Sequence, residues 1–136
     1  MTAPVPKTNA MLICDQVVTE QGTNKKSLIG IFEHIGAAQF PATHHSMSIY
    51  VKLTDAQGSY RFRLVLFDLN DDKTITDCTM PDGVHVESPL HSHELVFNLK
   101  GLQFPHPGEY EFRIFANDRI FGQKKFVVSE LPNKEK

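Results

Sequence analysis

The feature that most constrains this chain is an alternation of apolar and polar residues with a period of two. The runs in which it is clearest are residues 47–53, 60–66, 95–99 and 110–114. A period of two places every second side chain on the same face of an extended strand. No window of about 11 residues carries the apolar spacing of a helix. The chain is therefore predicted to be all-β, with strands that bury one face.

Weaker strand patterns and turn signals complete the predicted architecture. The weaker strands are expected over residues 11–18, 27–35, 73–78 and 121–128. Segments rich in Asn, Asp and Gly separate the runs, as in hairpin turns. About eight strands in 136 residues predict a single-domain, antiparallel, two-sheet β-sandwich of the immunoglobulin-like kind. Longer connections are expected over residues 36–45 and 79–89, where binding residues often lie.

The two ends differ from the middle of the chain. Residues 1–8 hold two prolines and few apolar side chains, and the last residues are polar and charged. Such segments rarely support packed structure. We therefore expect a β-sandwich domain over residues 9–129, with residues 1–8 and 130–136 as flexible tails.

Charge and cysteine content limit the classes of partner. The 14 basic and 16 acidic residues give a net charge of -2 and are interspersed, whereas nucleic-acid binding needs a clustered basic surface. No apolar run approaches the ~20 residues of a membrane helix, and the N-terminus does not resemble a secretory signal. Cys14 and Cys78 are too few for a disulfide framework. These features predict a cytoplasmic protein with reduced thiols and with neither nucleic acid nor membrane as partner.

Several segments resemble a known family. They are LICDQVV, SLIGIFEHI, FPATH and, near the end, LKGLQFPHPGEYEFRIFANDRIFGQKKFVV. In this order they are similar to a bacterial family of small uncharacterised all-β proteins, a domain of unknown function. Its members carry Leu-x-Cys-Asp, Leu-x-Gly-Ile-Phe, Phe-Pro-Ala and Pro-Gly-x-Tyr-x-Phe segments. The resemblance covers about residues 10–128 and implies a β-sandwich. It implies no established activity, so no catalytic residue or cofactor is carried over.

Histidines offer one candidate metal site. His91 and His93 are two residues apart, so on a strand they project from the same face, which continues toward Leu95. Two imidazoles at this spacing can share a metal ion when a third ligand is present, such as His85, His44 or a carboxylate. The alternative is that the pair lies at the rim of the core and makes ordinary hydrogen bonds.

Catalytic motifs are missing from the sequence. It contains no Gly-x-Ser-x-Gly, His-Glu-x-x-His or glycine-rich phosphate loop. Cys14 lies in an apolar strand and is interpreted as a buried structural thiol. Its neighbour Asp15 is expected to accept backbone or hydroxyl hydrogen bonds, because a buried carboxylate needs partners. The sequence therefore predicts a protein that is not an enzyme and holds no cofactor.

Two further positions have structural interpretations. Gly30, inside a strand, indicates the close approach of backbone or of a neighbouring ring. Tyr110 follows Gly108 by two residues and resembles the tyrosine corner of sandwich domains, in which the hydroxyl holds a loop.

Surplus apolar side chains point to an interface. They fall on faces that are otherwise expected to be polar, and they are Tyr50, Val65, Phe67, Phe115 and Phe121. A contiguous apolar patch on a protein surface marks a binding site, whereas scattered or covered side chains need no explanation. The leading prediction is a non-catalytic β-sandwich that binds another protein or a second copy of itself. The alternatives are a metal protein using His91 and His93, and a small-molecule or carbohydrate-binding sandwich, which follows from fold analogy alone.

Overall fold

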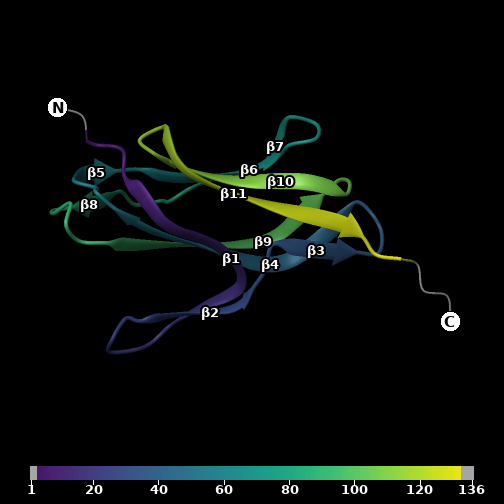
Figure 1. The fold of residues 1–136 in the computed structure, drawn as a ribbon, viewed down its shortest axis with the longest axis horizontal. Coiled ribbons are helices and arrows are strands. Elements are labelled where there is room, and N and C mark those ends of the chain that lie inside the picture. The colour runs from purple at the N-terminus through teal and green to yellow at the C-terminus, as the bar shows by residue number, and fades with distance from the viewer. Residues whose placement is uncertain (1–2, 133–136) are drawn as a thin grey trace.

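The computed structural model describes residues 3–132, and this part of the chain consists of strands and connecting loops (Figure 1). In chain order the strands are β1 (Lys7–Thr19), β2 (Lys26–Ile31), β3 (His34–Ala37), β4 (Ala42–Thr54), β5 (Gly58–Tyr60), β6 (Phe62–Asp68), β7 (Lys73–Thr79), β8 (Val84–Val86), β9 (His93–Phe104), β10 (Gly108–Ala116) and β11 (Arg119–Glu130). Within residues 3–132 no helix is long and apolar enough to cross a membrane.

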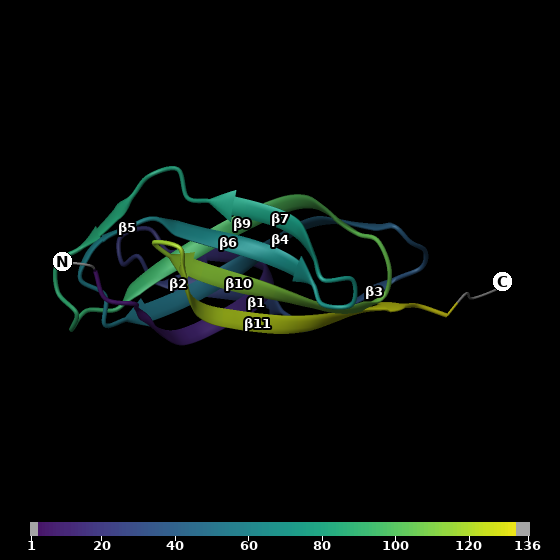
Figure 2. The same ribbon diagram turned by 90° about the horizontal axis from the view of Figure 1, so that it is seen from above.

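The strands form two large sheets and one small sheet. The first large sheet has the order β2-β1-β4-β9, and the second has the order β3-β11-β10-β6-β7. The small sheet pairs β5 with β8. Figure 1 shows the second large sheet lying over β1, β4 and β9 of the first, and Figure 2 shows the same layers from above. All neighbours pair antiparallel except β3 and β11, which are parallel.

The all-β prediction is confirmed, but the predicted strand count is too low. The additional strands are short: β3 has four residues and β5 and β8 have three each. Strands of this length are too short to show an alternation. The single strand expected over residues 27–35 is divided because the chain leaves the first sheet after β2 and joins the second as β3. The immunoglobulin-like arrangement stays a prediction.

The core lies between the two large sheets, where the alternating residues of the central strands meet. Ile49 and Val51 of β4 are completely buried, as are Leu64 of β6 and Phe112 and Ile114 of β10. Burying one such side chain contributes about 1.5–3 kcal/mol. The alternation that predicts these strands therefore identifies much of the core as well.

The start of the chain contacts the rest of the protein. β1 begins at Lys7, so the domain boundary predicted at residue 9 falls inside a strand. The Tyr60 hydroxyl donates a hydrogen bond to the Pro4 carbonyl at 2.6 Å. At the other end, the Leu131 amide donates to the Ala37 carbonyl at 2.7 Å. Residues 1–2 and 133–136 of the predicted tails lie outside the described residues.

Candidate functional site

A two-stranded extension of the first sheet, residues 15–31, is the most distinctive surface feature of the molecule. β1 pairs with β4 as far as Cys14 opposite Ser48, and beyond that point it pairs with β2 alone. We call this hairpin the arm. In Figure 1 it diverges from the two layers on the side away from β10 and β11. Because β2 is the terminal strand of its sheet, one of its backbone edges has no neighbouring strand among residues 3–132.

One face of the arm carries exposed apolar side chains. The register pairs Gln16 with Ile29 and Val18 with Ser27, so Val18, Ile29 and Ile31 project from the same face. Their exposed fractions are 40%, 50% and 55%. We call these three residues the apolar stripe. A flat edge strand with exposed apolar side chains favours pairing with another strand.

The opposite face of the arm brings Asp15 and Gly30 together. Cys14 pairs with Ile31 and Gln16 with Ile29, so Asp15 lies opposite Gly30. Gly30 has a φ of 70°, and a Cβ at this position would collide with the Asp15 carboxylate. A close approach at Gly30 is therefore observed, but it is made by the Asp15 carboxylate and not by backbone or a ring, and the positive φ favours glycine at this position.

Asp15 lines a pocket between the arm and the rest of the protein. The pocket has a volume of about 370 Å³, and its other side chains include those of Phe32, His34 and His44. His34 Nε2 lies 2.5 Å from the Ser129 hydroxyl. The Asp15 side chain is exposed and, among residues 3–132, takes part in no hydrogen bond or ion pair. The prediction that this carboxylate accepts backbone or hydroxyl hydrogen bonds at the sheet edge is therefore wrong, because β1 leaves the core after Cys14.

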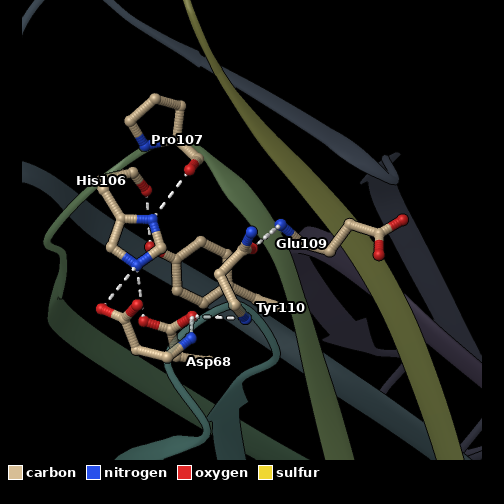
Figure 3. A network of polar contacts seen from close by, with 7 residues as sticks. Asp68, His106, Pro107, Glu109 and Tyr110 are labelled. Atoms are coloured by element: carbon tan, nitrogen blue, oxygen red, sulfur yellow. Dashed lines mark hydrogen bonds and ion pairs between the residues drawn. The ribbon is translucent and has the colours of Figure 1, made fainter.

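A second polar site joins the β6–β7 turn to the β9–β10 loop (Figure 3). His106 Nε2 lies 2.7 Å from Asp68 Oδ2 and 3.3 Å from Asp71 Oδ2. His106 Nδ1 lies 2.8 Å from the Pro107 carbonyl, to which it donates. Asp68 Oδ1 accepts from the amides of Asn70 and Asp71 at 3.0 and 3.2 Å. Because Nδ1 carries the proton that it donates to the carbonyl, Nε2 of a neutral ring would be unprotonated and would face two carboxylates as an acceptor. The contacts are favourable only if Nε2 is also protonated or if a cation lies between Nε2 and the carboxylates.

The pKa shifts of His106 and Asp68 agree with a proton on His106 Nε2, between the imidazole and the carboxylates. The hydrogen bond to the Pro107 carbonyl raises the pKa of His106, and the carboxylates of Asp68 and Asp71 raise it further against the opposing effect of burial. Burial alone would raise the pKa of Asp68. The hydrogen bonds from Asp71, His106 and Asn70 outweigh the effect of burial, so the pKa of Asp68 is lowered. Both shifts favour the ion pair, with His106 protonated and Asp68 ionised.

Tyr110 holds the loop on which His106 lies. Its hydroxyl donates to the His106 carbonyl at 2.6 Å, and the two rings stack with their centroids 5.8 Å apart. This hydrogen bond confirms the tyrosine-corner prediction. The sequence pattern finds Tyr110 and the turn residues, but it does not find the pairing of His106 with Asp68, which lie 38 positions apart.

The predicted metal ligands lie elsewhere. His85 belongs to β8, where its Nδ1 lies 3.2 Å from the Ser59 hydroxyl. His91 is exposed in a loop, and His93 is the first residue of β9. Among residues 3–132, the ligand atoms of Asp68, Asp71 and His106 form the one group of three that lies within 4.8 Å. That group contains none of the three predicted histidines.

The predicted apolar surface is not one exposed patch. Tyr50 and Val65 are buried. The Arg113 guanidinium lies 4.2 Å from the centre of the Phe67 ring, and that of Arg63 lies 4.9 Å from the Phe115 ring. Cations at these distances attract aromatic faces and cover them.

Phe121, the fifth residue predicted for this surface, packs against the core. Its ring meets that of Phe62 edge-on at 5.9 Å. Alternation predicts which face a residue occupies, but neighbouring side chains decide whether it is exposed.

Both cysteines are free thiols. Cys14 is completely buried, and its thiol donates to the Ser48 carbonyl at 3.7 Å. Burial is the largest cause of the raised pKa of this thiol. The interpretation of Cys14 as a buried structural thiol is confirmed, while Cys78 is partly exposed.

Two of the solved structures that match this chain share its fold at low sequence identity. An alkylpurine DNA glycosylase from Pseudomonas fluorescens matches 91% of this chain with 7% identity and a TM-score of 0.55. A β-glucosidase from Listeria innocua matches 94% with 10% identity and a TM-score of 0.50. The present chain spans 30% and 16% of these two chains. An immunoglobulin-like protein from Pseudomonas aeruginosa matches 92% of this chain, and 96% of its own, with 14% identity and a TM-score of 0.43.

Sequence comparison identifies the family of the chain. No curated protein matches it. A family model described as a family of unknown function, DUF6941, matches residues 9–129. This range covers most of the 136 residues and agrees with the resemblance carried by the sequence motifs. The chain therefore belongs to this family of unknown function.

Proposed function

We propose that this protein is a non-catalytic β-sandwich of the cytoplasm that binds another protein through the arm. The observation that carries the proposal is the terminal position of β2 combined with the exposed apolar stripe. Backbone groups along an edge strand can pair with an extended segment of a partner, and side-chain contacts then give specificity. The free state of both cysteines supports a reducing compartment.

Other surfaces offer less support for an interface. Phe67 and Phe115, on the second large sheet, are covered by arginines. Ile120 is exposed to 43%, but it lies in the β10–β11 hairpin, apart from the stripe. The arm combines a free backbone edge with exposed apolar area, which is the combination that strand pairing needs.

The proposal can be tested by site-specific photo-crosslinking in the native cell. A photoreactive amino acid replaces Ser27, which projects beside the stripe, in the otherwise unchanged chain and in the Ile31→Lys variant. A discrete cross-linked protein is expected, and its yield should fall strongly in Ile31→Lys. The Ile120→Lys variant is the matched control, because it adds the same charge at another exposed strand residue and should keep the product.

Two results would contradict the proposal. One is an equal yield in Ile31→Lys and Ile120→Lys. The other is a product that also forms when the photoreactive group is moved to position 120. Sedimentation of the purified chain separates a second copy from a different partner, because self-pairing through β2 would double the mass and would be lost in Ile31→Lys.

A further inference from the structure

We propose that the pocket beside Asp15 receives an arginine side chain of the partner segment that pairs with β2. This inference rests on the proposed function and specifies the chemistry of the partner. Its basis is the combination of an unpaired carboxylate, a glycine directly opposite it and a free strand edge, all at one place on the arm.

Strand geometry determines where the partner's side chains project. A segment added to β2 continues the alternation of the sheet, so the residue beside Gly30 projects on the face of Gly30 and Asp15. Its two neighbours project on the opposite face, where Ile29 and Ile31 are exposed. The partner segment is therefore expected to alternate in side-chain character. One side chain enters the pocket, and the residues before and after it contact the apolar stripe.

Gly30 leaves the path to the carboxylate open. With no side chain at Gly30, nothing on β2 lies between the added residue and the Asp15 carboxylate, which leans over the glycine. Neighbouring strands are about 4.8 Å apart. A side chain on the added strand must therefore reach back across roughly one strand spacing, and the long stems of arginine and lysine allow this.

Charge and shape favour arginine. Among residues 3–132 the Asp15 carboxylate has no cationic partner, and a guanidinium can donate two parallel hydrogen bonds to it. The pocket also contains the rings of Phe32 and His44, whose centroids are 5.9 Å apart. A planar guanidinium can stack on such rings. The partner sequence that fits is apolar–Arg–apolar in an extended conformation.

The test uses two peptides, acetyl-Thr-Val-Arg-Val-Thr-amide and its counterpart with citrulline in place of arginine. Citrulline has nearly the same shape but no charge. Each peptide is titrated into the full ¹⁵N-labelled chain, and backbone amide shifts are followed by NMR. The arginine peptide should shift the amides of Asp15 and of residues 29–32 and bind about tenfold more tightly than the citrulline peptide. Asp15→Asn should remove this preference.

Asp72→Asn is the matched control, because it removes an equally exposed carboxylate in the β6–β7 turn and should keep the preference for arginine. Equal binding of both peptides, or an unchanged preference in Asp15→Asn, would overturn the arginine site. If both peptides shift residues 29–32 equally, strand addition at β2 stands and only the assignment of Asp15 fails. If neither peptide binds, the arginine site is overturned, and the cross-linking experiment decides the proposed function separately.

Discussion

Asp68 Oδ2 and His106 Nε2 lie 2.7 Å apart and join the β6–β7 turn to the β9–β10 loop, which are distant in sequence. The Asp68 side chain is 1% exposed, so this ion pair is partly shielded from solvent. A buried carboxylate that loses its partners destabilises the folded state. The pair therefore links the β6–β7 turn to the loop that leads into β10.

Replacing Asp68 by asparagine should destabilise the protein. Asparagine keeps an oxygen for the amides of Asn70 and Asp71 but loses the charge opposite His106. We expect the free energy of unfolding to fall by about 2 kcal/mol near pH 6. Urea unfolding measures this change. Asp72→Asn, on an exposed side chain of the same turn, should change the free energy of unfolding by less than about 0.5 kcal/mol. Equal effects of the two substitutions would show that the pair contributes nothing specific.

The stabilisation by this pair should depend on pH. The pKa of His106 is raised from its ordinary value of 6.5, so the contribution is complete below that value and is lost as the pH rises through the higher folded pKa. The pKa of Asp68 is lowered from 3.8, so its contribution is present above 3.8 and is lost as the pH falls through the lower folded pKa. Unfolding free energies of the natural chain and of His106→Gln should differ clearly at about pH 5.5 and much less at about pH 8.5. A difference that grows toward high pH would contradict this sign.

Removing the Tyr110 hydroxyl should loosen the loop that it holds. Tyr110→Phe keeps the buried ring but removes the donor to the His106 carbonyl. The expected loss of stability is about 1 kcal/mol. Amide hydrogen exchange should become faster at His106 and Gly108, because Pro105 and Pro107 have no amide proton, and it should stay unchanged in the arm. Uniformly faster exchange across the whole protein would instead indicate a general loss of core packing.

Alanine should be tolerated less well at Gly30 than at Gly101. Both glycines have positive φ, 70° and 66°, so alanine strains the backbone at each. Within residues 3–132, nothing lies within 4 Å of a Cβ at Gly101, whereas a Cβ at Gly30 meets the Asp15 carboxylate. Gly101→Ala should lose about 1 kcal/mol and Gly30→Ala clearly more. The double variant Asp15→Ala with Gly30→Ala should recover the difference, as thermal unfolding can measure. No recovery would mean that backbone strain alone explains the effect.

The sequence by itself determined the local features of this protein. An alternation with a period of two follows from the geometry of any extended backbone, so it predicts the strands and the inward residues Ile49, Leu64 and Phe112 without knowledge of the fold. Turn chemistry and the glycine–tyrosine spacing are also local, and they predict the hairpins and the role of Tyr110. For the same reason, strands as short as β3, β5 and β8 remain undetected.

Only the tertiary structure decided what surrounds each exposed or polar side chain. Whether Phe67 is bare or covered depends on the neighbouring strand that supplies Arg113. The pairing of His106 with Asp68 depends on the packing of two turns, and the free Asp15 carboxylate depends on where β1 leaves its neighbour β4. These relationships join residues through space, because close packing rather than chain order determines which side chains meet.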